Sequence, residues 1–341
     1  MLLEGLHIPL TTPFHPDGRL NPHKLAANVL RYSLTPAAGL IILGPSGEPT
    51  LLSDDETREA LRTAAEAASP EKILVAGIAR DSVHSTLDLA TFAADQNYDA
   101  VLIPVSAVLA LSQTAALLTF FRAIADRSPL PLVLLSTPQR PIPVEAASEL
   151  AAHPNIVGLL AQDDISTADL VAGTASIKQD VTVTHVFAAV TGRMQRSASQ
   201  SGASLISPAS LTTAVAEAPA KPALRTRTRS VGFQIISGNT STMLDALNDG
   251  ATGIAPAFAA AAPQACYEVY AAWKDQDQPL ASEKQQRLLD AARLVEPVGP
   301  AALKFAADLN GYFGGLPRLP HLPLSGEQRS ATEVLMKPLR N

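Results

Sequence analysis

Pro131–Pro138 reads PLVLLSTP, and Asn155–Gln162 reads NIVGLLAQ. Each stretch carries a short apolar run that is flanked by proline or asparagine, residues that are common in turns. Near-continuous apolar runs of this length are typical of parallel strands that are covered on both faces. Six more runs of the same kind occur along the chain. The eight predicted strands are His7–Thr12, Gly39–Leu43, Ile73–Ile78, Ala100–Val105, Leu132–Ser136, Ile156–Leu160, Phe233–Ser237 and Thr252–Ala255.

Helical patterns separate these predicted strands. Ser53-Asp54-Asp55-Glu56 is a capping box, which marks the start of a helix, and three later segments are amphipathic at helical spacing. The three segments are Ser112–Asp126, Val144–Ala152 and Thr242–Asn248, the last of which is followed by Gly250 as a helix-ending residue. Eight strands that alternate with helices predict an α/β fold, a closed (β/α)8 or TIM barrel.

Three more helical patterns follow the eighth predicted strand. They lie around Cys266–Lys274, Ser282–Val295 and Ala301–Leu309. A (β/α)8 barrel needs about 250 residues, so these helices exceed what the barrel requires. We therefore assign residues 1–260 to the barrel and residues 261–341 to a C-terminal helical extension.

One interval between predicted strands is abnormally long. The distance from Ile156 to Phe233 is more than twice the roughly 30 residues that a barrel of this kind allots to each strand–helix unit. The excess lies near residues 183–230, which are rich in Ala, Ser, Thr and Pro and poor in large apolar residues. We predict a mobile surface insertion there. Its basic residues, set against the single acid Glu217, are Arg193, Arg196, Lys221, Arg225, Arg227 and Arg229.

Composition limits the partners of this protein. The net charge of -6 disfavours nucleic acid or an anionic membrane as a partner of the whole chain, although the basic insertion leaves a docking role open. The single cysteine, Cys266, excludes an intrachain disulfide and fits a reducing compartment. The first residues lack a signal-peptide pattern, and the run Ala251–Ala262 is interrupted by Pro256 and too short to span a bilayer. We expect a cytoplasmic protein without a membrane segment.

Several motifs, in a fixed order along the chain, point to one family. They are Thr12-Pro13-Phe14 with Asp17-Gly18, Gly44-Pro45-Ser46-Gly47-Glu48, Pro131–Pro138 with Arg140, Asn155–Gly158, Ser237-Gly238-Asn239, Lys304–Gly311 and Arg318–Leu324. The ordered set resembles the dihydrodipicolinate synthase / N-acetylneuraminate lyase family. The resemblance implies a (β/α)8 barrel with a helical extension, usually in a homodimer or homotetramer, that acts on 2-oxo acids such as pyruvate.

The resemblance also implies a chemistry for which this sequence lacks the groups. In the family, a lysine on the sixth strand forms a Schiff base, and a tyrosine on the fifth strand, a loop threonine and a neighbouring subunit's tyrosine relay protons. The matching positions hold Leu160, Leu135, Pro45 and Ser106. A Schiff base needs a primary amine, and leucine has none. Neither Leu135 nor Pro45 can relay a proton. We therefore predict no Schiff-base activity and assign no catalytic residue.

Other positions retain features of a binding site. The turn formed by Gly44, Ser46, Gly47 and Glu48 can offer amides and a hydroxyl to a carboxylate. By resemblance, Arg140 holds a substrate carboxylate, and Gly238 and Asn239 line the pocket. The predicted ligand is a small carboxylate or 2-oxo acid.

Two alternatives to this binding function remain open, and we expect no cofactor or metal. A lyase or hydratase could use non-Schiff-base chemistry through Gln162, Asp163 or Asp164, which follow the sixth strand. A non-catalytic scaffold, or a partner of an active paralogue, is the other alternative. The seven histidines have no ligand spacing, which disfavours a built-in metal site.

Overall fold

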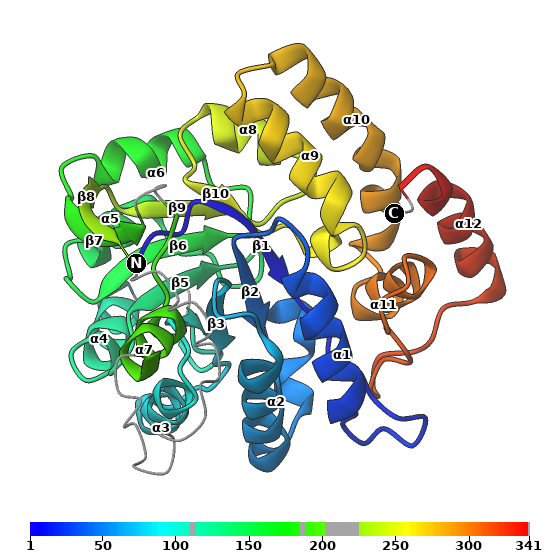
Figure 1. Ribbon diagram of the computed structural model, residues 1–341, viewed down its shortest axis with the longest axis horizontal. Coiled ribbons are helices and arrows are strands. Elements are labelled where there is room, and N and C mark those ends of the chain that lie inside the picture. Colours follow the sequence, from blue (N-terminus) through cyan, green and yellow to red (C-terminus); the bar gives the residue numbers. More distant parts are fainter. Residues whose placement is uncertain (110–113, 185–187, 202–224, 340–341) are drawn as a thin grey trace, which may run out of the picture.

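A closed barrel of eight parallel strands forms the centre of the computed structural model (Figure 1), which describes residues 1–109, 114–184, 188–201 and 225–339. The barrel strands are β1 (Gly5–Pro9), β2 (Gly39–Ile42), β3 (Ile73–Gly77), β4 (Ala100–Pro104), β5 (Leu132–Ser136), β6 (Ile156–Ala161), β9 (Gln234–Ser237) and β10 (Gly253–Ile254). Their order around the barrel is β1-β10-β9-β6-β5-β4-β3-β2. All eight predicted strands and the (β/α)8 class are confirmed.

The strands alternate between an outer and an inner apolar cluster. On β2, Leu40 and Ile42 pack outward among the helices, whereas Ile41 points into the barrel. We call the inward set the inner cluster: Leu3, Ile41, Ile73, Val75, Ala100, Leu102, Val133, Leu135, Val157, Leu160, Ile236 and Ala255. Leu3 lies at the N-terminal end of the strands, where its amide donates to Gln234 Oε1 at 2.6 Å. Side chains therefore fill the barrel, as its narrow interior requires.

Helices surround the barrel. They are α1 (Pro22–Ser33), α2 (Asp54–Ala67), α3 (Val83–Asp95), α4 (Thr114–Ala125), α5 (Val144–Ala151), α6 (Thr167–Thr174) and α8 (Met243–Asn248). The predicted capping box is present at α2, where Ser53 and Glu56 bond each other's backbone amides. Within the described ranges, no helix combines the length and apolarity that a membrane crossing needs.

The chain after β10 forms a helical extension on one side of the barrel (Figure 1). It contains α9 (Pro263–Lys274), α10 (Gln278–Val295), α11 (Pro300–Leu309) and α12 (Gly326–Met336). The first three match the predicted helices. The fourth was not predicted, although Ser325 and Gln328 form a second capping box at its start.

Both ends of the segment near residues 183–230, where a mobile surface insertion is predicted, carry regular secondary structure. β7 (Gln179–Thr184) and β8 (Thr226–Val231) pair as an antiparallel ribbon, and α7 (Gly192–Ser201) follows β7. Val181 and Val183 on β7 are buried against Leu2. Residues 202–224, with Lys221 and Glu217, lie outside the described part of the chain.

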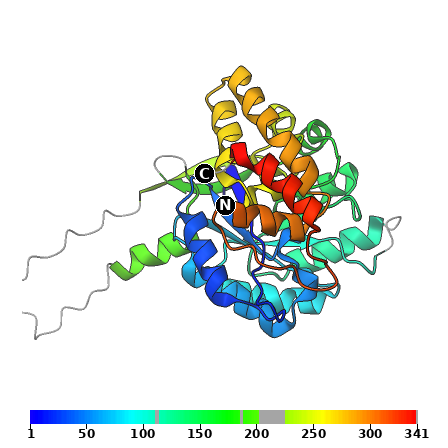
Figure 2. The same cartoon turned by 90° about the vertical axis from the view of Figure 1, so that its right-hand side faces the viewer.

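This ribbon and α7 lie at the N-terminal end of the barrel, on the opposite side from the start of α4 (Figure 2). Arg193, at the start of α7, is largely buried and donates to the carbonyls of Lys72 and Asn97 beside the starts of β3 and β4. Its Nη2 lies 3.7 Å from Asp99 Oδ2, while Asp99 Oδ1 accepts from the amide of Gly192 at 2.8 Å. Burial raises the pKa of Asp99 and lowers that of Arg193. The described ends of this segment are thus attached at the opposite end of the barrel from the C-terminal ends of the strands.

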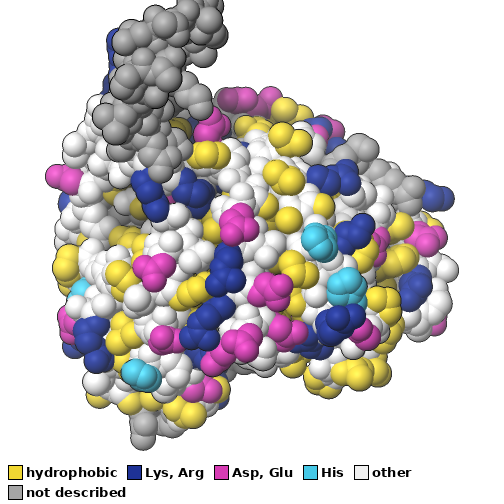
Figure 3. Space-filling view, turned by 60° about the horizontal axis from the view of Figure 1, so that its bottom comes forward, with side chains coloured by type: hydrophobic (Ala, Val, Ile, Leu, Met, Phe, Trp, Pro, Cys, Tyr) yellow, Lys and Arg dark blue, Asp and Glu magenta, His cyan; other side chains and the backbone are white. Residues whose placement is uncertain are grey.

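Charges of both signs are interspersed on the surface. In the face of Figure 3, Lys and Arg side chains lie among Asp and Glu side chains. Arg80 and Asp54, for example, form an ion pair with 2.6 Å between Nη2 and Oδ1. This mixture accords with the modest negative net charge of the chain.

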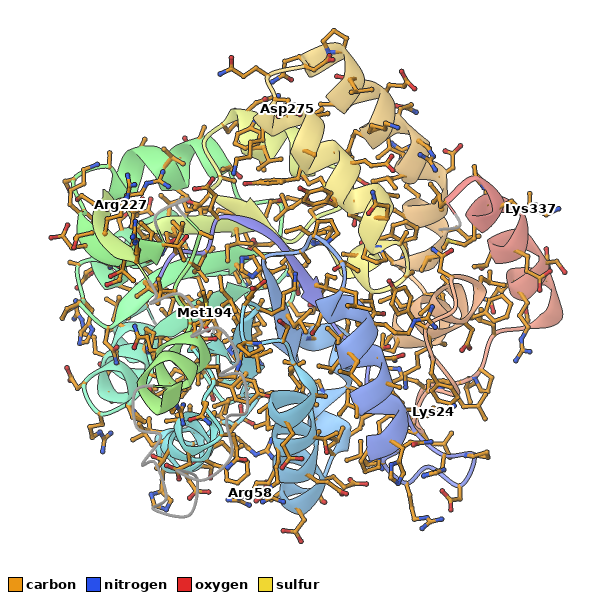
Figure 4. All side chains as sticks on the ribbon, viewed as in Figure 1. Lys24, Arg58, Met194, Arg227, Asp275 and Lys337 are labelled. Atoms are coloured by element: carbon orange, nitrogen blue, oxygen red, sulfur yellow. The ribbon has the colours of Figure 1, made fainter. Side chains whose placement is uncertain are left out.

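A large cavity of about 1080 Å³ lies at the N-terminal end of the barrel, between β1, α7 and α9. Met194 on α7 and Asp275 after α9 lie on two of its sides (Figure 4). Two of its charged lining residues form an ion pair: Glu4 bonds Lys274 at 2.9 Å and also bonds Arg229 at 3.0 Å. The carbonyls of Thr35 and Ala37 accept from Lys72.

The contact of α7 with the barrel can be tested by replacing Arg193. We expect Arg193→Ala to lower the free energy of unfolding by about 2–3 kcal/mol, because it leaves the buried Asp99 carboxylate without its cation. Urea denaturation measures the loss. Arg196→Ala, at an exposed position on the same helix, is the matched control and should change stability by less than about 0.5 kcal/mol. Equal losses in the two variants would contradict the contact.

Candidate ligand-binding site at the barrel mouth

The loop after β2 forms part of the mouth. It contains two short 3-10 turns, Pro45–Gly47 and Pro49–Leu51, and both Leu43 and Glu48 adopt left-handed backbone conformations with φ of 57° and 55°. Such conformations are unfavourable for residues with a side chain and often occur at functional sites. A Cβ at Gly77 would collide with the Leu43 carbonyl, so glycine is required there.

A cavity of about 300 Å³ opens at the C-terminal ends of β2, β3, β4 and β5, and we call it the mouth cavity. This is the end of the strands at which (β/α)8 barrels carry their active sites. The residues that line it are Leu43, Gly44, Pro45, Pro49, Thr50, Gly77, Ile78, Ala79, Arg80, Asp81, Leu102, Pro104, Val105, Ser106, Ala107, Leu135 and Thr137. Most of this lining is apolar.

Leucines of the inner cluster lie beneath the mouth cavity. Leu135 lines it and pairs in register with Leu160 on β6, which pairs in turn with Ile236 on β9. Leu160 is 1% exposed and Leu135 is 4% exposed. A Cβ at Gly238 would lie 3.2 Å from Leu160 Cδ1, so the backbone of Gly238 closes over this leucine. The inner cluster therefore continues up to the floor of the mouth cavity.

The predicted site residues divide into two sets. Gly44, Pro45, Ser106 and Leu135 all line the mouth cavity. Gly47, Glu48, Arg140, Gly238 and Asn239 do not line it, and neither do Ser46 and Leu160. The structure thus brings together three of the four positions that were predicted to replace catalytic residues of the family, but only one of the seven predicted ligand-binding residues.

Ser46 is buried beside Pro45 and has an available hydroxyl. Its side chain is 5% exposed. Within the described residues, no hydrogen bond involves its hydroxyl group. A serine hydroxyl can both donate and accept a hydrogen bond. Ser46 therefore retains the capacity to bind a small polar ligand.

Arg140 and Ser106 stabilise the loop after β4. Arg140 donates to the carbonyl of Leu109 and to that of Ala107, each at 2.6 Å. The hydroxyl of Ser106 and the amide of Ala107 both donate to Asp81 Oδ1. The guanidinium that was predicted to hold a carboxylate is therefore bonded to the backbone of one wall of the mouth cavity.

Glu48 lies in a buried network with the C-terminal extension. It forms an ion pair with Lys304 of α11, which is fully buried, and its Oε2 accepts from the Arg318 amide at 3.0 Å. Burial lowers the pKa of Lys304. Lys304 Nζ and the Arg318 guanidinium each lie 4.3 Å from the centre of the Phe14 ring. Glu48 therefore attaches the mouth loop to the extension.

Asp163 after β6 and Asn239 after β9 also have structural partners. Asn239 Oδ1 accepts from the amide of Ser241 at 2.9 Å, which stabilises a turn. Asp163 Oδ2 accepts from the hydroxyl of Ser136 at 2.5 Å, and Ser136 Oγ accepts from the Ile142 amide at 2.8 Å. Asp163 therefore fixes the loop between β5 and α5 and is not part of the mouth cavity lining.

Arg80 is a polar residue of the mouth cavity that sequence reasoning missed. It follows β3, at the C-terminal end of the barrel, which is where a charged residue could have been noticed. No lysine is among the described residues that line the mouth cavity. Among the residues whose positions are described, no group of three His, Cys, Asp or Glu side chains is arranged to hold a metal ion.

The fold and the mouth cavity define the class: (β/α)8-barrel proteins with a candidate site at the C-terminal ends of the strands. The chain belongs to the dihydrodipicolinate synthetase family, whose model matches residues 2–203 and 214–339. A 4-hydroxy-tetrahydrodipicolinate synthase from Acidiphilium cryptum (strain JF-5) is 27% identical over 340 residues, which cover 98% of this chain and 98% of that protein. The resemblance seen in the sequence is confirmed.

Solved structures of the same family share the fold. Dihydrodipicolinate synthase from Bacillus anthracis has a TM-score of 0.78 at 20% identity, with 100% of both chains covered. A monomeric dihydrodipicolinate synthase variant has a TM-score of 0.75 at 19% identity, covering 98% of this chain and 96% of that one. Since one of these neighbours is monomeric, family membership does not fix the number of subunits, and a homodimer or homotetramer stays a prediction.

The attachment of the extension should depend on pH through Glu56. Bidentate bonding from Arg318 lowers the pKa of Glu56 from 4.5 to about 2. A lowered carboxyl pKa stabilises the folded protein above pH 4.5, and this contribution is lost as the pH falls toward 2. Because the pair is partly exposed, we expect Glu56→Gln to cost about 1 kcal/mol at neutral pH.

Urea denaturation at a series of pH values measures this difference. The stabilities of wild type and Glu56→Gln should converge as the pH falls from 4.5 toward 2. The variant retains a side chain that can complete the capping box of α2, so the helix start is preserved. A difference that stays constant over this range would contradict the proposed ion pair.

Proposed function

We propose that this family member does not form a Schiff base and instead binds a small carboxylate or 2-oxo acid in the mouth cavity. The observation that carries the proposal is the apolar floor. Leu160 and Leu135 occupy the positions at which the resemblance expects the lysine and the tyrosine, and both belong to the inner cluster. An imine cannot form without an amine at the carbonyl carbon of the ligand.

The lysines in the described part of the chain do not supply the amine that is missing at position 160. Lys72 lies at the N-terminal end of β3, where it donates to two backbone carbonyls. Lys304 is fully buried in its ion pair with Glu48. A reactive lysine must reach the ligand with a free electron pair, and neither of these side chains lines the mouth cavity.

The open mouth cavity favours a binding protein over a plain scaffold. A scaffold needs no cavity at the strand ends, whereas this chain retains about 300 Å³ there together with the available hydroxyl of Ser46 nearby. A concave, mostly apolar pocket with a few polar groups is the usual form of a small-molecule site. The lyase or hydratase alternative receives less support, because Asp163 is engaged by Ser136 outside the mouth cavity.

The curated relatives are named as synthases, so the proposal separates this chain from them by its site. Family membership sets the barrel and the location of the pocket. The reaction depends on particular side chains, and the same barrel supports many chemistries. We therefore assign this chain the family's binding location without its imine chemistry.

Hydride trapping tests the loss of imine chemistry. Pyruvate with borohydride should give no site-specific mass increase on the wild-type chain, because none of the described residues that line the mouth cavity is a lysine. A family member that retains the sixth-strand lysine serves as the positive control. Intact-mass measurement followed by peptide mapping detects any adduct. An adduct on one specific lysine of the wild type would overturn the proposal and identify the residue that had replaced the missing amine.

Restoring the amine alone should not restore turnover. We expect Leu160→Lys to give at most slow imine formation with pyruvate, because Leu135 and Pro45 still lack the groups that relay protons. Trapping over a time course measures the rate of adduct formation, and Leu160→Met is the matched apolar control. Fast, complete labelling together with turnover in Leu160→Lys would show that the relay residues are not needed.

A further inference from the structure

The mouth cavity is larger and more apolar than a three-carbon acid requires. Its volume of about 300 Å³ corresponds to roughly ten water molecules at their liquid volume. Leu43 after β2, Leu102 on β4 and Leu135 on β5 all line it. Pyruvate would leave much of this apolar surface in contact with water, so the lining favours a ligand with an apolar body.

Arg80 supplies a cation at the same cavity. Its side chain is only 18% exposed. Nη1 donates to the carbonyl of Ala79 at 3.0 Å, while Nη2 donates to Asp54 at 2.6 Å and to Thr57 at 3.3 Å. A guanidinium has five N–H donors. Three of them are used in these bonds, so two have no partner among the described residues. These bonds hold the side chain in place while it keeps the capacity to bind an anion.

Two carboxylates lie near Arg80, and neither of them occupies the two donors that remain. Asp54 is 68% exposed on α2, so water weakens its interaction with the guanidinium. Asp81, which also lines the cavity, has its Oδ1 bonded to Ser106 and to the Ala107 amide. Arg140 is bonded to the loop after β4 and does not line the cavity. Among the described residues that line the mouth cavity, Arg80 is therefore the one cation.

We propose that the mouth cavity is specific for a monocarboxylate with a branched aliphatic or aromatic body. Arg80 binds the carboxylate, and the leucines from β4 and β5 contact the apolar body. This inference rests on the proposed function and narrows it, because it names the ligand class and the residue that recognises the charge. Arg80 is a binding residue in this assignment and takes no part in covalent chemistry.

A series of 2-oxo acids tests the specificity by isothermal titration calorimetry on the full chain. The probes are pyruvate, 2-oxobutanoate, 4-methyl-2-oxopentanoate and phenylpyruvate. Each buried methylene should tighten binding about fourfold, so 4-methyl-2-oxopentanoate should bind at least about tenfold more tightly than pyruvate. The neutral amide of 4-methyl-2-oxopentanoic acid should bind about tenfold more weakly than the acid, because it lacks the charge that Arg80 recognises.

Variants of Arg80 test the anchor. Arg80→Gln should weaken 4-methyl-2-oxopentanoate binding about tenfold or more, and Arg80→Lys should weaken it less because the charge remains. The matched control is Arg58→Gln, which removes a comparable ion pair with Asp88 outside the mouth cavity. It should bind the acid as wild type does. Circular dichroism and the melting temperature establish that each variant is folded; if Arg80→Gln unfolds, the acid–amide comparison on the wild type decides.

The outcomes separate this inference from the proposed function. If none of the acids binds, the proposed carboxylate-binding function fails, and the inference fails with it. If pyruvate binds as tightly as the larger acids, or if folded Arg80→Gln binds them as wild type does, the inference alone is overturned. A preference for larger acids that is lost in Arg80→Gln supports both.

Discussion

The interior of an eight-stranded barrel has room for little besides side chains, so the inward side chains of its own strands must fill it. In this chain the filling runs from Leu3 at the N-terminal end to Leu135 and Leu160 at the other end. Each strand contributes inward residues and packs its alternate residues against the helices. Because the same apolar cluster closes the barrel and forms the floor of the mouth, the chemistry available at the mouth is limited by the packing beneath it.

The walls of the mouth are fixed by contacts from distant parts of the chain. Lys304 and Arg318 of the extension bond Glu48 in the loop after β2. Arg140, after β5, bonds the backbone of the loop after β4. Most of the charged residues that the motifs single out around the site are thus used in holding loops. Arg80 differs because it lines the mouth cavity and, among the described residues, two of its guanidinium donors have no partner.

The strands were predictable because both of their faces are buried, which produces apolar runs that need no knowledge of the fold. β8 gave no such signal, because Thr226–Val231 is almost entirely exposed. It pairs with β7, whose Val181 and Val183 are buried. Contacts between side chains that lie far apart in the sequence could not be predicted either. Glu48 could be recognised as part of a motif, but its partner Lys304 lies in another part of the chain. Arg80 follows a strand without any motif, so only its location in the fold identifies it.

Leu160 constrains how this sequence can change over time. It is 1% exposed and surrounded by apolar residues of the inner cluster, so an ammonium group at this position would be desolvated without a carboxylate beside it. Its polar neighbours on β6 and β9 are backbone groups already paired between the strands. A substitution of Leu160 by lysine alone is therefore expected to give a less stable protein. Selection for folding alone therefore preserves the leucine, whatever ligand the mouth binds.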